Sequence, residues 1–350
     1  MSQASDHAIH TLSEFLLHGG TNFQIFDLGR GVHPMDTQFF LELENGMRPC
    51  PRPRQQHAWF AIVFWSEGSK ANHYIWFVKF PIDERGLLVA AARNHFLQII
   101  LDALGQSLSE EKQDTLPDNP YSFVPNQSQM AQFSAVSKSC LSLPFNEGVN
   151  DVAQYINAPA ISDWRKLSVQ SIADFAQSLT DQSTCKAVMA NMPLFHAEFT
   201  RTLLAAAETV SIPSVFKQFC AKHCTDTLAS DPTVALAALR ALSNEQPDSI
   251  VHAVLDTLLN SSQLDIHVLS VIAGRHYAQL TEHRLTQFFE HAAALDEAES
   301  MDGKLFAGFF SDLVQLPMLR AEVLAVLRAT DRSDTLARAF GHLFSQTQKK

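Results

Sequence analysis

Glycine is scarce in this sequence, which contains only 13 glycines among its 350 residues. There is no Gly-x-Gly-x-x-Gly pattern, no Walker-type phosphate loop and no Gly-x-Ser-x-Gly nucleophile elbow. The 15 histidines include no His-Glu-x-x-His pair of the kind that binds catalytic zinc. The sequence therefore predicts no catalytic residue and no cofactor, and it favours a protein that is not an enzyme.

Cysteine is also sparse, and the odd number of five, without disulfide-framework spacing, indicates a reduced protein. On a helix, Cys220, His223 and Cys224 would lie close enough to offer three soft ligands to a metal. A zinc site needs a fourth ligand or a bound water, and no second Cys/His pair lies nearby in the sequence. Because Phe216 and Phe219 make the surroundings apolar, we interpret the group as structural and predict no metal site.

Long apolar runs are missing as well. No segment approaches the roughly 20 apolar residues that a membrane helix needs. The N-terminus lacks a basic start, and Asp6 and Glu14 interrupt any apolar core, so we do not expect a signal peptide. Together with the cysteine usage, these features predict a cytoplasmic protein that does not insert into a membrane.

Basic residues are outnumbered, with 26 Lys and Arg against 37 Asp and Glu and a formal charge of −11. This balance disfavours a nucleic-acid partner, because neutralising phosphates requires Lys and Arg. The one local basic candidate is Pro51-Arg52-Pro53-Arg54, for which a proline-rich loop is the alternative interpretation.

The most strongly patterned stretch runs from residue 57 to residue 104. His57–Trp65 and Tyr74–Phe80 are apolar and rich in aromatic and β-branched residues, which predicts two strands joined by a hairpin. A helix is expected from about Gly86, ending at Gly105. Both alternating residue sets of the first strand are apolar, so we expect both of its faces to be covered. Trp76, on the second strand, is predicted to lie buried in the core.

Shorter elements precede the hairpin. We expect a helix over residues 8–18 with Asp6 as a possible cap, a strand over 22–28, and a helix over 37–44 capped by Asp36. The resulting order of helix, strand, helix, strand, strand and helix predicts a small α+β domain over residues 1–105, a sheet with flanking helices.

A polar, proline-containing segment follows at residues 106–126 and predicts a linker between two domains. We expect limited proteolysis to cut first between Gln106 and Asn126, because this segment is acidic and has almost no apolar residue before Tyr121. Identification of the first fragments by mass checks this. A first cut inside the C-terminal region, with the linker protected, would contradict the boundary.

Residues 127–350 show only helical patterns, which predicts an all-α domain. Helix starts are expected near residues 232, 248, 265, 282, 302, 318 and 333. The first four intervals are about 17 residues each, so one helix pair would take about 34, within the range of α-solenoid repeats. Residues 231–242, Asp-Pro-Thr-Val-Ala-Leu-Ala-Ala-Leu-Arg-Ala-Leu, resemble a HEAT-type repeat helix, whereas the tetratricopeptide signature is absent.

Three segments carry a wider resemblance: Phe26–Arg30 (FDLGR), Ile75–Phe80 (IWFVKF) and Asp83–Leu88 (DERGLL). Through them nearly the whole chain is similar to an uncharacterised family of gammaproteobacterial proteins, catalogued as a domain of unknown function. The resemblance implies one shared architecture. It implies no activity, cofactor or functional residue.

Charged residues follow two of the expected strands. Asp27, Arg30 and His33 come after the first strand, and Asp83, Glu84 and Arg85 come after the third. If these strands are parallel neighbours, both groups lie at one edge of the sheet and form a candidate ligand or interaction cluster. The alternative is a pair of salt-bridged turns in which Asp83 caps the following helix.

Two functional hypotheses follow. The first is a protein-interaction or regulatory adaptor, in which a helical-repeat groove binds an unidentified protein partner. The alternative is an enzyme or small-ligand sensor that uses the charged cluster, and it requires a concave pocket at those strand ends.

Overall fold

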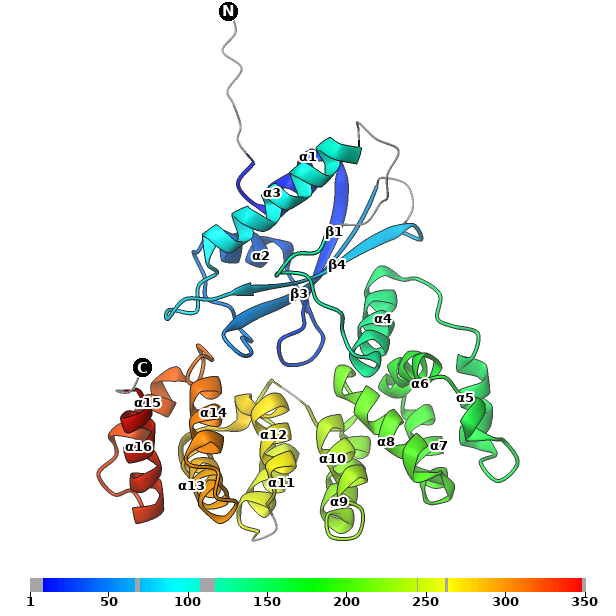
Figure 1. Ribbon diagram of the computed structural model, residues 1–350. Coiled ribbons are helices and arrows are strands. Elements are labelled where there is room, and N and C mark those ends of the chain that lie inside the picture. The colour runs from blue at the N-terminus through cyan, green and yellow to red at the C-terminus, as the bar shows by residue number, and fades with distance from the viewer. Residues whose placement is uncertain (1–8, 67–69, 108–116, 244, 262–263, 348–350) are drawn as a thin grey trace, which may run out of the picture. The chain divides into compact units, whose positions relative to one another are not determined.

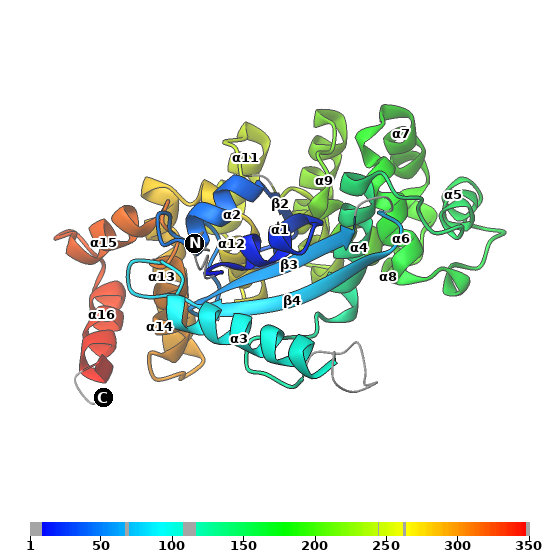
Figure 2. The ribbon, with the colours of Figure 1, turned by 90° about the horizontal axis from the view of Figure 1, so that it is seen from above.

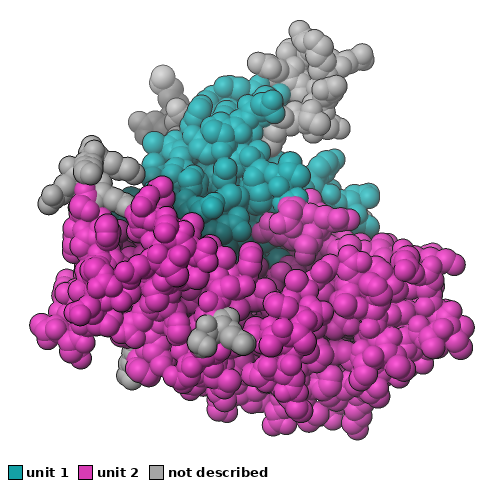
Figure 3. Space-filling view, turned by 60° about the horizontal axis from the view of Figure 1, so that its bottom comes forward, with its two compact units in different colours: residues 1–125 teal, residues 126–350 magenta. Residues whose placement is uncertain are grey.

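The computed structural model describes residues 9–66, 70–107, 117–243, 245–261 and 264–347 (Figure 1). The chain forms two compact units, Met1–Pro125 and Asn126–Lys350 (Figure 3). Within the described residues, no helix combines the length and the apolar character that crossing a membrane requires.

The first unit is a four-stranded antiparallel sheet with three helices. Its elements are α1 (Leu12–His18), β1 (Thr21–Asp27), β2 (His33–Met35), α2 (Thr37–Glu44), β3 (His57–Ser66), β4 (His73–Pro81) and α3 (Ala90–Ser107). The strand order is β2-β1-β3-β4, so the hairpin strands β3 and β4 pair directly, as expected. The small α+β class is therefore confirmed.

The helices α1, α2 and α3 cover one face of the sheet (Figures 1 and 2). The register places Ile25 opposite Ile62, and Ile62 opposite Trp76. Alternate residues of a strand point to opposite faces, so Phe60 and Ile62 of β3 share the helix-covered face and enter one core with Phe40 and Phe96. Ala61 and Val63 point to the other face and are also fully buried.

Side-chain caps fix the ends of the first two helices. Asp36 caps α2 as predicted, accepting hydrogen bonds from two backbone amides of its first turn. Helix α1 begins later than predicted, at Leu12, because Thr11 and Glu14 form a capping box there. Asp6, the predicted cap, lies outside the described residues. The buried Glu44 carboxylate at the end of α2 also accepts the amides of Leu12 and Ser13, at 2.8 and 3.1 Å.

Two local expectations are wrong. Residues 33–35 form the edge strand β2, which the sequence analysis did not predict; Pro34 suits an edge, because it donates no ladder hydrogen bond. The third helix begins at Ala90 rather than Gly86, because Leu88 pairs back with Ile82 in a β-bridge. Gly86 lies in the left-handed region (φ +80°) inside that turn. The helix also continues past Gly105 to Ser107.

The hairpin tryptophans differ in burial. Trp65 is buried, whereas Trp76 is partly buried and packs against the core of the first unit, so its predicted burial in that core is confirmed only in part. Trp76 lies nearer the hairpin end of β4 than Val78 and Phe80, which share its face and are buried. Its ring packs against Phe64, with centroids 4.5 Å apart, and against Phe96 at 6.1 Å.

Residues 121–123, which fall inside the predicted linker, lie against β4. Ser122 forms a β-bridge with Val78, and the compact first unit extends to Pro125. Residues 108–116 of the predicted linker lie outside the described residues. The linker over 106–126 as a whole stays a prediction, which the proteolysis experiment above tests.

Every element assigned in the described part of the second unit is a helix. The α-helices are α4 (Gln127–Leu141), α5 (Val149–Asn157), α6 (Val169–Ala176), α7 (Gln182–Asn191), α8 (Ala197–Ala206), α9 (Ser214–Thr227), α10 (Pro232–Ala241), α11 (Ser249–Leu259), α12 (Ile266–Arg275), α13 (Glu282–Ala298), α14 (Lys304–Leu313), α15 (Arg320–Arg328) and α16 (Asp334–Thr347). Short 3₁₀ helices are η1 (Trp164–Lys166), η2 (Gln177–Thr180), η3 (Met192–Leu194), η4 (Ala207–Thr209) and η5 (Tyr277–Gln279). All seven predicted helix starts are confirmed to within two residues.

The helices of this unit make contacts in two alternating series. Along one series α4, α6, α8, α10 and α12 each touch the next, and along the other α5, α7, α9, α11 and α13 do the same (Figure 1). Aspartates cap several of these helices, and Asp231, Asp248 and Asp265 accept amide hydrogen bonds at the starts of α10, α11 and α12. The apolar faces meet in one continuous core.

Candidate functional site

The two strands that lead into the predicted charged cluster run parallel but are not neighbours. Both β1 and β4 pair antiparallel with β3, which lies between them. Their C-terminal ends therefore lie at the same end of the sheet, separated by about 10 Å, twice the spacing of adjacent strands. The strands are thus parallel, as the cluster requires, but they are not the neighbours that the condition named.

The first half of the cluster is a buried polar turn. Asp27 is fully buried, and its carboxylate accepts the Gly29 amide at 2.8 Å and pairs with Arg52 at 3.3 Å. Arg30 is also buried, and its Nε donates to the Pro53 carbonyl at 3.0 Å. The structure thus packs the turn after β1 against the proline-rich loop at 51–54.

Glycine at position 29 is required by this packing. A Cβ atom there would lie 1.9 Å from the Arg52 carbonyl oxygen, so a side chain would force the two backbones apart. His33 begins β2, and its Nε2 lies 3.4 Å from the Arg30 carbonyl. The structure therefore brings Asp27, Arg30 and His33 into one turn, joined by Arg52.

The second half is a separate turn after β4. Asp83 Oδ1 accepts the amides of Arg85 and Leu87, at 2.9 and 2.8 Å, so this carboxylate organises its own loop rather than capping α3. Glu84 and Arg85 are exposed. The arrangement is that of an Asx-type turn, which is a common structural use of aspartate.

The cysteine-histidine group on α9 is apolar in character. Cys220 and Cys224 are buried, and burial raises the pKa of the Cys224 thiol to about 12. Burial also lowers the pKa of His223, whose ring stacks on Phe219 with centroids 5.8 Å apart. Among the described residues no group of three or more His, Cys, Asp or Glu side chains could hold a metal ion.

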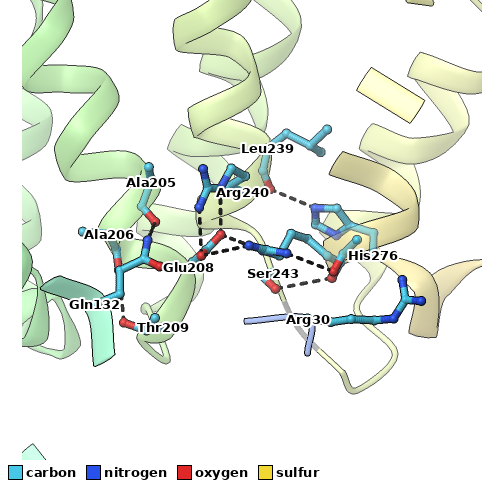
Figure 4. A network of polar contacts seen from close by, with 12 residues as sticks. Arg30, Gln132, Ala205, Ala206, Glu208, Thr209, Leu239, Arg240, Ser243 and His276 are labelled. Atoms are coloured by element: carbon cyan, nitrogen blue, oxygen red, sulfur yellow. Dashed lines mark hydrogen bonds and ion pairs between the residues drawn. The ribbon is translucent and has the colours of Figure 1, made fainter. Parts of the chain in front are cut away.

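A buried ion-pair network joins three helical segments of the second unit (Figure 4). Glu208 of η4 binds Arg240 at the end of α10 through two hydrogen bonds of 2.7 and 2.9 Å. Arg275, the last residue of α12, binds the same carboxylate at 2.8 Å. The Glu208 side chain is 2% exposed, and although burial opposes its charge, the two guanidinium groups lower its pKa to about 2.

His276 extends this network on the α12 side. Its Nε2 lies 2.9 Å from the Leu239 carbonyl, so the proton resides on Nε2 and donates to that oxygen (Figure 4). The fully buried Nδ1 has no hydrogen-bond partner among the described residues. Burial lowers the pKa of His276 to about 4, so this imidazole stays neutral at physiological pH and acts as a structural link.

A second group in this unit reaches the surface. Trp164 in η1 is partly buried, and its indole stacks on the His196 ring with centroids 4.3 Å apart and an angle of 15°. The Arg165 guanidinium lies 5.4 Å from the indole centroid. Close in sequence, Ile161 is 89% exposed and Leu194 is 64% exposed. We call these five residues the Trp164 surface.

The Trp164 surface rests on a buried support. His196 is the N-cap of α8, and its backbone amide donates to the hydroxyl of the buried Tyr155 at 3.0 Å. An aromatic pair with a guanidinium and exposed aliphatic side chains matches the chemistry of protein-interface hot spots. The sequence analysis missed this group; the signal available was a tryptophan inside the polar segment Ser162–Lys166 (SDWRK).

The fold and these sites define a two-unit protein, in which a helix-covered antiparallel sheet is followed by a long helical unit. The family profile described as "Protein of unknown function (DUF3549)" matches residues 7–344, so the chain belongs to this family. The resemblance inferred from the three segments is thereby confirmed at the level of the family. A comparison with curated proteins gave no match, and a comparison with solved structures gave none.

Proposed function

We propose that the helical unit is a stack of HEAT-type repeats of about 32 residues, and that the chain acts in the cytoplasm as a protein-interaction or regulatory adaptor. What supports the stack is a recurring separation between bonded residues. Side chains bond across 32 positions at Gln177–Thr209, Glu208–Arg240, Ser243–Arg275, Glu245–Tyr277 and Leu259–His291. Equivalent contacts at one fixed spacing are expected where each repeat packs on the next.

The observation that carries the binding role is the Trp164 surface. Tryptophan and arginine side chains are enriched among the residues that dominate binding energy at interfaces. Ile161 and Leu194 add apolar area, and Arg165 and Lys166 add positive charge in a chain whose net charge is −11. The partner that fits this surface is a protein segment with an apolar side chain next to an acidic one.

Replacing Trp164 with alanine is expected to lower recovery of a stoichiometric partner at least about tenfold, because a hot-spot side chain contributes about 1.4 kcal/mol or more to binding. The full chain, tagged and purified from native lysate, serves as bait. Phe344→Ala is the matched control, since Phe344 is a 54% exposed aromatic on α16 of the same unit. Because Trp164 also packs against the core of this unit, the thermal midpoint of both variants is measured, and partner recovery is compared at a temperature where both are folded.

The adaptor proposal fails if the wild-type chain recovers no stoichiometric partner under several lysis conditions. The assignment to the Trp164 surface fails if Trp164→Ala recovers the same partner in the same amount. The control variant separates a loss of this surface from a general loss of binding through a changed fold.

The alternative function is an enzyme or small-ligand sensor at the charged cluster. The observation that favours it is the burial of Asp27 and Arg30 in one turn with His33. A small molecule that stays bound to the purified chain in native mass spectrometry, and is lost from Asp27→Asn, would support this function over the adaptor. A nucleic-acid partner remains disfavoured by the net charge, and salt-dependent retention on a nucleic-acid column would reverse that expectation.

A further inference from the structure

The outer edge of β4 holds a short piece of extended chain. The Lys79 amide donates to the Tyr121 carbonyl at 2.8 Å, and the Phe123 amide donates to the Phe77 carbonyl at 3.1 Å. Ser122 lies between these bonds and forms an antiparallel bridge with Val78. Residues 121–123, which we call the edge segment, thus add to the sheet as strands add in β-augmentation.

The ring contacts place the two aromatic side chains of the edge segment on opposite faces of the sheet. Residues two apart in a regular strand would share one face, and the difference arises because the chain bends at Tyr121, whose amide donates to Asn119 Oδ1 at 3.0 Å. Phe123 packs edge-on against Trp59, with centroids 4.8 Å apart, and against Phe77 at 5.8 Å. This is the face of β3 and β4 that α1, α2 and α3 do not cover.

Tyr121 occupies the helix-covered face. Its ring lies 5.7 Å from that of Phe80 and 6.0 Å from that of Phe96. Its hydroxyl lies 3.0 Å from Nδ1 of His95 on α3. The edge therefore has two aromatic seats, one on each face, that are two residues apart along the bound chain.

The edge segment covers only part of the available edge. Phe77 and Lys79 direct backbone groups outward, so Ile75, two residues earlier, does the same. The amide and carbonyl of Ile75 have no hydrogen-bond partner among the described residues. An extended chain longer than the edge segment could pair with β4 over more of its length.

We propose that the β4 edge is a binding site for a peptide that pairs with β4 as the edge segment does, with aromatic side chains at positions i and i+2 and a bend at position i that turns the first ring to the helix-covered face, and that the edge segment occupies this site in cis. Main-chain pairing supplies affinity and the two aromatic seats supply specificity. A tethered segment has an effective concentration in the millimolar range, so a partner peptide must exceed it to displace the edge segment. This site is separate from the Trp164 surface and does not depend on the adaptor proposal.

The test removes both aromatic side chains of the edge segment and supplies the same segment as a separate peptide. The full chain carrying Tyr121→Ala and Phe123→Ala is titrated with a synthetic peptide of residues 118–125, Asp-Asn-Pro-Tyr-Ser-Phe-Val-Pro, and binding is measured by calorimetry and tryptophan fluorescence. The double variant is expected to bind the peptide at least about tenfold more tightly than the wild type does, because its site is vacant. Val124→Ala is the matched control and should behave as wild type, since Val124 is 89% exposed.

Two altered peptides test the spacing. A peptide with alanine at both aromatic positions should bind at least about tenfold more weakly. A peptide with one serine inserted between Tyr and Phe should also bind at least about tenfold more weakly, because a shift of one residue turns one ring away from its contacts when the other ring is in place. Equal binding of all three peptides would overturn the assignment of the seats.

The proposal is overturned if the double variant melts like the wild type and binds no peptide at millimolar concentration. It is also overturned if the wild type and the double variant bind the peptide equally, because the peptide would then bind elsewhere. If the double variant does not fold, the single variant Phe123→Ala replaces it under the same criteria, since Tyr121 still anchors the chain.

Discussion

Replacing Glu208 with glutamine should destabilise the helical unit by about 3 kcal/mol at pH 7. The pKa of Glu208 is lowered from 4.5 to about 2 in the folded chain, and each pKa unit corresponds to about 1.4 kcal/mol. Removing the charge also leaves Arg240 and Arg275 without their shared counter-ion, and breaking a buried pair in this way typically costs about 3–5 kcal/mol. Denaturant titration followed by far-ultraviolet ellipticity measures the difference.

The lowered pKa of Glu208 also determines how the stability difference between the two proteins changes with pH. A carboxylate with a lowered folded pKa stabilises the fold above its unfolded pKa, and the contribution is lost as pH falls toward the folded value. The gap between the wild type and Glu208→Gln should therefore narrow by about 2 kcal/mol between pH 7 and pH 3. Burial lowers the pKa of His276 to about 4, and the Glu208 charge, the smallest of the contributions to that shift, opposes it; the His276 contribution therefore cancels between the two proteins except for this small coupling.

Glu297→Gln is the matched control, because Glu297 pairs with Arg338 at 3.0 Å on the surface of the same unit. Exposed pairs contribute about 0–1 kcal/mol, so this variant should stay near the wild type at every pH. A Glu208→Gln variant as stable as the control at pH 7 would show that the network does not stabilise the helical unit.

Replacing Phe60 with alanine should destabilise the first unit by about 3–5 kcal/mol, the usual cost of truncating a buried phenylalanine. Phe60 is fully buried on β3 and packs edge-on against Phe40 of α2, with ring centroids 5.2 Å apart. That loss is a large share of the roughly 5–15 kcal/mol that stabilises a typical domain. Tyr74→Ala on β4 is the control, because Tyr74 is 63% exposed.

The tryptophans allow the two units to be followed separately. Trp59, Trp65 and Trp76 lie in the first unit, whereas Trp164 lies in the second. In Phe60→Ala the fluorescence transition should move to lower denaturant, while the ellipticity of the helical unit keeps its midpoint. A common shift of both transitions would show that the two units unfold together, against the expectation of separate domains.

Much of the architecture could be predicted from local chemistry. Aspartates before apolar stripes, such as Asp231 and Asp265, set helix starts, and the structure confirms them. Strand β2 could not be predicted, because three residues with a central proline carry no periodicity and pair only when β1 lies beside them. The late start of α3 depends on the bridge between Ile82 and Leu88, which is a tertiary contact.

The candidate sites were harder to predict, because they form through contacts between residues that are distant in sequence. Trp164 and His196 are far apart in sequence, and only the packing of their loops stacks the two rings. Glu208 is one of 37 acidic residues, and nothing local distinguishes it from the others. The candidate cluster at the strand ends depended on whether β1 and β4 are neighbours, and the sequence could not show that β3 lies between them.

Glu208 binds one arginine 32 residues further along the chain and another 67 residues further along. In the proposed stack, those arginines belong to the next repeat and to the one after it. In a stack joined only by contacts between adjacent repeats, the terminal repeats can unfold one at a time. A single carboxylate that binds two successive repeats couples their unfolding to the unfolding of the repeat that contains Glu208. In the proposed stack the region from η4 to α12 therefore unfolds as one cooperative block inside an otherwise modular unit.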